Sequence, residues 1–228
     1  MPAPDADRND PPPYAQYRAP REDDAALVSP DWATQLRQLA DRTPRPAIEL
    51  AGQPLPELSE LARREVVRIA AETGGHGNAS AGRQVANGPL VVSGHQPELF
   101  HPGVWFKNFA LDALAKAAGG MGVHLRIDSD LCRTPSVTAP TGPPDSPRSA
   151  TVPYDRAAAP RPHEERRVLD EAAWASFPDR LAEAAGVLCP TPLVGAIWAD
   201  AESARAEGAT LGEALSVARH RLERRHGS

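Results

Sequence analysis

Residues 91–130 decide the fold, and they read VVSGHQPELFHPGVWFKNFALDALAKAAGGMGVHLRIDSD. A short apolar and β-branched run over residues 89–93 predicts a buried strand. A loop punctuated by glycine and proline follows, and residues 103–118 carry the apolar spacing of a helix that a Gly-Gly pair ends. Residues 122–127 alternate apolar and polar side chains, which predicts a second strand. Such a strand-helix-strand crossover makes the two strands parallel and is right-handed in nearly all cases.

The composition of the remaining chain predicts four parts. Residues 1–28 are rich in Pro, Asp and Arg without apolar periodicity, so we expect a disordered N-terminal arm. Residues 29–132 hold the strand-helix-strand core. Residues 133–162 are Pro-rich, and we expect a loop or linker that contributes no core. Residues 163–228 predict a helical segment.

Helices are predicted on both sides of the core. The Ser-Pro-Asp triplet at 29–31 predicts a helix to about Ala40, with Ser as the N-cap. Residues 57–72 form an amphipathic helix with one apolar stripe. The capping box at 210–213 opens the last helix, whose arginine-rich end, residues 219–225, is expected to be a solvated face.

The predicted sheet is small. No strand is expected after residue 130. Two parallel strands make a poor sheet, because parallel sheets ordinarily have more strands and are covered by helices on both faces. We therefore expect an incomplete core that belongs to the N-terminal part of a longer protein or to a truncated relative of one.

Bulk properties narrow the function. The net charge of −5 and the pI of about 5.8 give no basic surface for nucleic acid. Cys132 and Cys189 cannot build a disulfide framework or a metal cluster, so free thiols in a reducing cytoplasm are expected. No apolar run approaches the roughly 20 residues of a membrane span. We expect a cytoplasmic protein with a small-molecule ligand, while its cofactor and oligomeric state stay open.

Polar side chains gather where the first strand ends. Gly94 permits a sharp turn, and His95 and Gln96 follow it with an imidazole and an amide that can bind a phosphate, hydroxyl or carboxylate. His101 directly precedes the helix, whose first N–H groups bind anions well. The alternative is that these side chains only satisfy the backbone of their own loop.

Further candidates follow in the helix and after the second strand. Lys107 and Asn108 lie about one turn into the helix, where Lys107 can stabilise a bound anion and Asn108 can orient a ligand. Asp128 and Asp130 follow the second strand, and they can hold an amine, a hydroxyl or a metal ion. The alternatives are that Lys107 is an ordinary solvent-exposed lysine and that Asp128 and Asp130 lie in a turn without a functional role.

At these residues the chain resembles the bacillithiol-biosynthesis cysteine-adding enzyme family. Members of that family carry a strand followed by Gly-Gln-Gln-Pro-x-Leu-Phe, a loop, and a helix with a lysine. The matching residues here are 91–100 and Lys107, with His95 in place of the first glutamine. Asp128 and Asp130 stand where the next strand of the family ends in acidic residues.

The resemblance implies a Rossmann-like, nucleotidyltransferase-like parallel core with extra helices. It also implies a ligase or group-transfer protein that binds a small phosphorylated, nucleotide or sugar ligand, because the family joins cysteine to a glucosaminyl-malate acceptor. In such chemistry His95 would be the general acid or base and Asp128 the second catalytic group. Two alternatives stay open: a non-catalytic binding module or fragment, and a nucleotide-sugar transferase that uses Asp128 and Asp130. Whether the chain is an enzyme stays open too.

Overall fold

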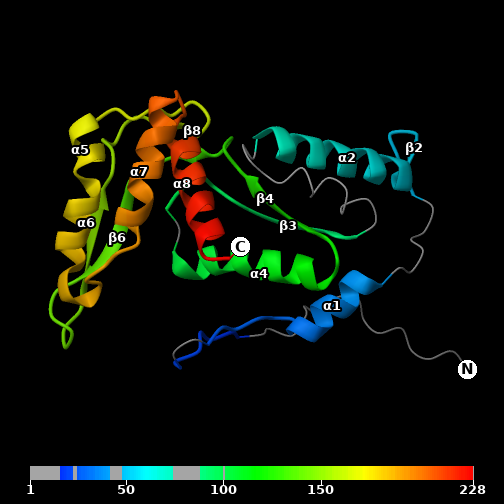
Figure 1. Cartoon of the computed structure of the whole chain (residues 1–228), viewed down its shortest axis with the longest axis horizontal. Helices are drawn as coiled ribbons and strands as arrows, with labels where there is room; N and C mark the ends of the chain where they lie inside the picture. Colours follow the sequence, from blue (N-terminus) through cyan, green and yellow to red (C-terminus); the bar gives the residue numbers. More distant parts are fainter. Residues whose placement is uncertain (1–15, 23–24, 42–47, 74–87, 100, 228) are drawn as a thin grey trace, which may run out of the picture. The chain divides into compact units, whose positions relative to one another are not determined.

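The chain has a mixed α/β fold with small sheets, one of which is a parallel pair (Figure 1). It divides into two compact units, Met1–Arg42 and Thr43–Ser228, and each is described by itself. The structure is a computed structural model that describes residues 16–22, 25–41, 48–73, 88–99 and 101–227.

The first unit contains helix α1 (Trp32–Ala40), which ends where the sequence predicts. Its N-cap is Asp31 and not Ser29, because the Asp31 carboxylate accepts a hydrogen bond from the backbone N–H of Thr34 at 3.0 Å. The described residues before α1 lie in neither helix nor strand. Most of the expected N-terminal arm, residues 1–15 and 23–24, lies outside the described residues.

The predicted parallel crossover is confirmed in the second unit. Strand β3 (Leu90–His95) pairs in parallel with β4 (Met121–Arg126), and helix α4 (Pro102–Ala117) connects them. The register aligns Leu90 with Met121 at one end and His95 with Arg126 at the other. Figure 1 shows α4 running beside this pair of strands.

The two faces of β3–β4 differ. A Cβ placed at Gly122 would lie 3.4 Å from Leu111 and 3.7 Å from Ala115, so the Gly122 face of β4 packs on α4. Val92 and Leu125 point to the opposite face, where they are 53% and 47% exposed. The expectation that Val92 is buried is therefore wrong. Val123 lies on the same face and is only 7% exposed, so within the described residues this face is covered at Val123 and open at Val92 and Leu125.

Residues 133–162 correct a second expectation, because they contain regular strands. Strands β6 (Ser136–Thr141) and β7 (Arg148–Pro153) form an antiparallel hairpin, and the short strands β5 (Leu131–Cys132) and β8 (Arg161–Pro162) pair with each other. The prolines are tolerated because every strand of a two-stranded sheet is an edge strand, on which alternate N–H groups need no partner.

The main hydrophobic core lies in the C-terminal part of the second unit. Helix α6 packs on the β6–β7 hairpin, and α7 packs on α8 (Figure 1). The aromatic rings of Trp174, Phe177 and Trp198 pack against one another at tilted angles in this core, with the centroids of the Trp174 and Trp198 rings 4.3 Å apart. The helices around it are α5 (Glu171–Ala175), α6 (Phe177–Ala185), the 3₁₀ turn η1 (Gly186–Leu188), α7 (Val194–Ala206) and α8 (Leu211–Arg225).

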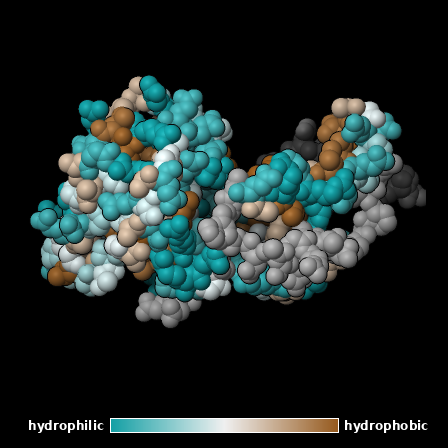
Figure 2. Space-filling view, turned by 45° about the horizontal axis from the view of Figure 1, so that its top comes forward, coloured by the Kyte–Doolittle hydropathy of each residue, from teal (hydrophilic) through white to brown (hydrophobic). Residues whose placement is uncertain are grey.

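The amphipathic helix predicted over 57–72 is α2 (Leu55–Thr73), which follows the two-residue strands β1 (Glu49–Leu50) and β2 (Gln53–Pro54). Its apolar stripe is largely uncovered, since Leu61 and Ile69 are exposed. The face of the molecule in Figure 2 is mostly hydrophilic, with smaller apolar patches in brown. None of the helices within the described ranges has the length and apolar character needed to cross a membrane.

Candidate functional site

The loops that follow β3 and β4 are joined at one edge of the sheet. The side-chain amide of Gln96 donates a hydrogen bond to the Asp130 carboxylate at 2.6 Å. The backbone N–H of Ile127 donates to the carbonyl oxygen of His95 at 3.1 Å. The structure therefore brings His95, Gln96 and Asp130 together, as the parallel crossover predicts for residues that follow neighbouring strands.

Asp128 belongs to the same edge and is paired with a cation. The Nε of Arg126 donates to its carboxylate at 2.8 Å, and the Arg126 guanidinium also lies 3.6 Å from the Glu213 carboxylate of α8. The carbonyl oxygens of Asp128 and Asp130 accept backbone N–H groups from Glu164 and His163 at 3.0 Å each. These bonds hold the acidic turn against the segment that follows β8.

The acidic pair gives no support to a magnesium site. Asp128 faces Arg126, while Asp130 faces the Gln96 amide, so the two carboxylates serve different partners. Throughout the described residues, no group of three or more His, Cys, Asp or Glu side chains is placed to hold a metal ion. The nucleotide-sugar transferase that uses Asp128 and Asp130 stays a prediction that these contacts do not test.

Two predicted ligand contacts have structural tasks. The Nδ1 of His101 accepts a hydrogen bond from the Gly103 N–H at 3.1 Å, so His101 is the N-cap of α4. At Gly94 a Cβ would lie 3.3 Å from the Cβ and carbonyl oxygen of Leu125, which is tighter than an ordinary contact. Gly94 thus lets β3 approach β4 closely, and both residues shape the edge on which the other groups stand.

Asn108 is buried and holds α4 to α8. It is 5% exposed, and its amide donates to the Glu223 carboxylate oxygen Oε1 at 2.6 Å. The indole N–H of Trp105 donates to the same oxygen at 2.8 Å, and the Nε of Arg219 lies 3.3 Å from it. The expectation that the Asn108 amide orients a ligand is therefore corrected, since Glu223 takes that amide. Its side-chain oxygen is buried without a hydrogen-bond partner.

Arg219 and Glu223 were missed because the end of the last helix was interpreted as a solvated face. Both are buried, with exposed fractions of 9% and 5%. The periodicity held the signal: Leu215, Arg219 and Leu222 recur at spacings of four and three, so they share one face of α8 with Glu223. Arg219 and Glu223 form an i,i+4 pair within the apolar stripe of α8, and this position explains why both are buried.

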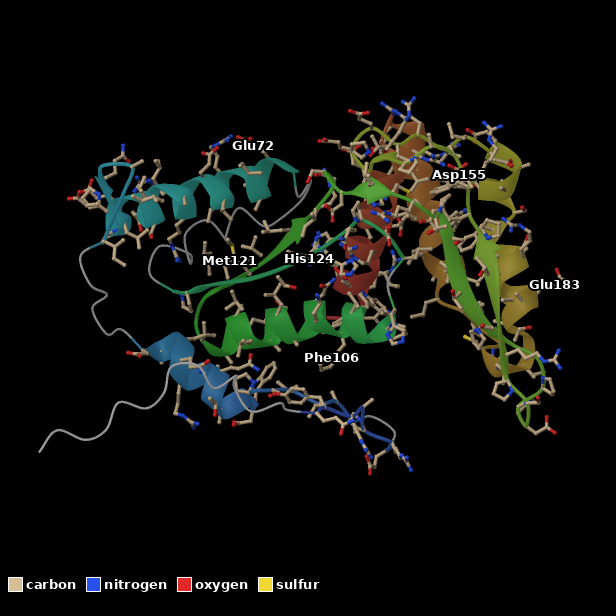
Figure 3. All side chains as sticks on the ribbon, turned by 180° about the vertical axis from the view of Figure 1, so that it is seen from behind. Glu72, Phe106, Met121, His124, Asp155 and Glu183 are labelled. Atoms are coloured by element: carbon tan, nitrogen blue, oxygen red, sulfur yellow. The ribbon has the colours of Figure 1, made fainter. Side chains whose placement is uncertain are left out.

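His124, labelled in Figure 3, lies on the face of β4 that packs on α4. It shares this face with Gly122, because alternate residues of β4 point the same way. Burial lowers the pKa of His124 to about 4, and the positive charge of Arg219 adds to this effect. The negative charge of Glu223 opposes it, and Lys107 and His95 lower the pKa by smaller amounts. Lys107 is exposed, as a group that meets a ligand from solvent should be. The candidate site thus combines His95, Lys107 and His124 beside the joined loops.

The two cysteines carry no chemistry in this site. Both are free thiols, and Cys132 is buried. Burial raises the pKa of the Cys132 thiol, so its reactive thiolate form is disfavoured. A nucleophilic role for Cys132 finds no support.

Comparison with known proteins yields no relative for this chain. It matches no protein-family model, and neither a curated protein nor a solved structure matches it. The resemblance over residues 91–100 therefore depends on its short motif, and functional assignment depends on the geometry of the site.

Proposed function

We propose that this protein binds a small anionic ligand, such as a nucleotide or a sugar phosphate, at the carboxyl end of β3–β4. The observation that carries the proposal is the hydrogen bond from Gln96 to Asp130, which joins the loops that follow the two parallel strands. Ligands of open α/β sheets bind outside the carboxyl ends of the strands. His95 and Lys107 supply the imidazole and the ammonium group that such a ligand would meet there.

The chemistry that fits these groups is a ligation or a group transfer. His95 stands at the strand end as the general acid or base, and Lys107 stabilises anionic charge on the ligand. Asp128, held by Arg126, accepts a hydrogen bond from a ligand hydroxyl or amine. The parallel β3–α4–β4 unit and the motif at 91–100 support a Rossmann-like core similar to that of the cysteine-adding enzymes. A cytoplasmic location belongs to the same proposal and is supported by the two free thiols.

A binding module without catalysis is the second candidate, and a specific observation favours it. Glu223 takes the Asn108 amide, His101 caps α4, and both acidic side chains have partners, so few groups remain for chemistry. The two candidates differ in turnover. An enzyme loses product formation in the His95→Ala variant even when ligand is saturating, whereas a binding module forms no product with any co-substrate.

The test begins with a thermal-shift screen of nucleotides, sugar phosphates and thiols, followed by calorimetric titration of the compounds that stabilise the protein. His95→Ala should weaken binding about tenfold, the loss of one charge-assisted hydrogen bond, while the melting temperature stays near that of the wild type. His226→Ala, which alters an exposed histidine at the end of α8, is the matched control and should bind normally. A large loss of stability in His95→Ala with unchanged affinity would make His95 structural and remove the proposal.

A further inference from the structure

A cavity lies in the segment from Ala158 to Leu169, which includes β8 and precedes α5. It measures about 320 Å³ and is lined by Ala158, Ala159, Arg161, Glu165, Arg166, Arg167 and Leu169. This volume is at the lower end of the range of about 300–1,000 Å³ seen for small-molecule sites. The cavity is therefore large enough for a compact ligand.

One wall of the cavity is apolar. Ala158, Ala159 and Leu169 form it. Leu169 is 43% exposed, so a large aliphatic side chain is left partly uncovered at this place. An apolar ligand body that covered Leu169 would gain about 25 cal/mol for each Å² removed from water.

Arg166, one of the lining residues, belongs to a buried ion pair. Arg166 is buried, and its guanidinium donates to the Asp155 carboxylate at 2.8 Å and to the carbonyl oxygen of Arg156 at 2.6 Å. Asp155, labelled in Figure 3, also accepts the backbone N–H groups of Leu169 and Asp170 at 2.9 and 2.8 Å. The Nε of Arg166 is buried without a hydrogen-bond partner. This network pre-organises the cavity at the cost of one unsatisfied donor.

The rim carries an excess of positive charge. Arg167 donates to the carbonyl oxygens of Gly208 and Ala209, which are neutral groups, and no carboxylate among the described residues forms an ion pair with it. Arg161 is exposed, and in the described part of the chain no carboxylate forms an ion pair with it. Glu165 is the single lining carboxylate, so the rim retains one net positive charge after Asp155 has neutralised Arg166.

We propose that this cavity is a second ligand site, for a small organic anion that has an oxyanion head and a short apolar body. The head meets the guanidinium groups of Arg161 and Arg167, since a planar guanidinium presents paired N–H donors that match carboxylate and phosphate oxygens. The body covers Leu169 on the apolar wall. Carboxylates and phosphate monoesters share this chemistry.

Four probes separate the contributions of the head and the body. Benzoate and phenyl phosphate carry both parts, benzyl alcohol lacks the charge, and inorganic phosphate lacks the apolar body. Titration of the full chain with each, followed by calorimetry or by NMR shifts of labelled arginine side chains, should show saturable binding of benzoate, of phenyl phosphate, or of both at millimolar concentration. Whichever of the two binds more tightly identifies the preferred head group. The truncated probes should bind at least several-fold more weakly.

Variants locate the binding. Arg161→Ala should weaken binding of the preferred probe about tenfold, which is the loss expected for a hydrogen bond to a charged group. Arg148→Ala removes an exposed arginine of β7 outside the cavity and should leave the affinity unchanged. Circular dichroism should show native folding in both. His95→Ala should also bind the probe with normal affinity. The test of this cavity is therefore independent of the test of the proposed site at β3–β4.

Three results would overturn the proposal. The first is the absence of saturable binding for both benzoate and phenyl phosphate. The second is equal affinity for a truncated probe, which would mean an apolar surface or an adventitious ion only. The third is an Arg161→Ala variant that binds as tightly as the wild type.

Discussion

Replacement of Glu223 by alanine tests whether the buried polar cluster holds α4 to α8. Three groups converge on one oxygen of this carboxylate: the Asn108 amide at 2.6 Å, the Trp105 indole N–H at 2.8 Å and the Arg219 Nε at 3.3 Å. Burial by itself raises the pKa of Glu223, but its polar neighbours outweigh burial and the pKa lies below its usual value. Glu223 is therefore ionised in the folded protein near neutral pH.

The expected loss follows from what the substitution leaves behind. Removing one partner of a buried ion pair costs about 3–5 kcal/mol, because the remaining charge stays in a poorly solvated place. Each neutral donor left without an acceptor costs about 1–3 kcal/mol. These two costs are not additive, because all three partners share one oxygen and the cluster relaxes after the substitution. We therefore expect Glu223→Ala to lower the free energy of unfolding by about 3–5 kcal/mol in total. For a chain of this size such a loss lowers the melting temperature by about 10 °C.

Urea unfolding, followed by circular dichroism and by tryptophan fluorescence, measures this loss. Helix propensity cannot mimic it, since alanine is at least as good a helix former as glutamate. Glu223→Gln keeps one acceptor oxygen and should lose less stability than Glu223→Ala. His226→Ala alters an exposed position at the end of α8 and should stay within about 0.5 kcal/mol of the wild type. A Glu223→Ala protein within about 1 kcal/mol of the wild type would refute the role of the cluster.

Three further predictions concern β3, β4 and their loops. The pKa of His124 is lowered from 6.5 to about 4, so the contribution of neutral His124 to the free energy of unfolding is fully present above about pH 6.5 and is lost as the pH falls towards 4. This contribution is at most about 3 kcal/mol. The His124→Gln variant should therefore show a flatter dependence of the free energy of unfolding on pH between about 4 and 6.5. Val92→Asp should remain soluble and lose no more than about 1 kcal/mol in urea unfolding, since Val92 is 53% exposed, and a loss above about 3 kcal/mol would mean that this face is covered in solution. Gln96→Ala should speed amide hydrogen exchange in the loops on both sides of its bond to Asp130 with little change in melting temperature; unchanged exchange would show that the bond is absent in solution.

Local patterns predicted several elements correctly. The alternation around His124 and the apolar spacing of residues 103–118 predicted β4 and α4, and the capping box at Thr210 predicted the start of α8. Each of these depends on residues that are at most a few positions apart. The parallel pairing of β3 with β4 was also predicted, because two adjacent strands that are joined by a helix ordinarily run parallel.

Longer-range features were not predictable in this way. The Pro-rich composition of residues 133–162 suggested a segment without a core, yet Ala139 and Val152 lie buried in the β6–β7 hairpin against the C-terminal helices. Proline content reports the tendency of an isolated chain, whereas a two-stranded edge with a helix packed on it tolerates proline at alternate positions.

The sequence by itself determined where the strand-helix-strand unit lies, which polar residues follow its strands and where the flanking helices begin, because spacing and capping are local properties. Only the tertiary structure decided which of those polar groups are bonded to other parts of the protein. Asn108 meets Glu223 across 115 positions of the chain, and that contact turns an expected ligand contact into part of a buried cluster. The periodicity of α8 marks the face that carries Arg219 and Glu223, but only the tertiary structure shows that Trp105 and Asn108 of α4 meet that face.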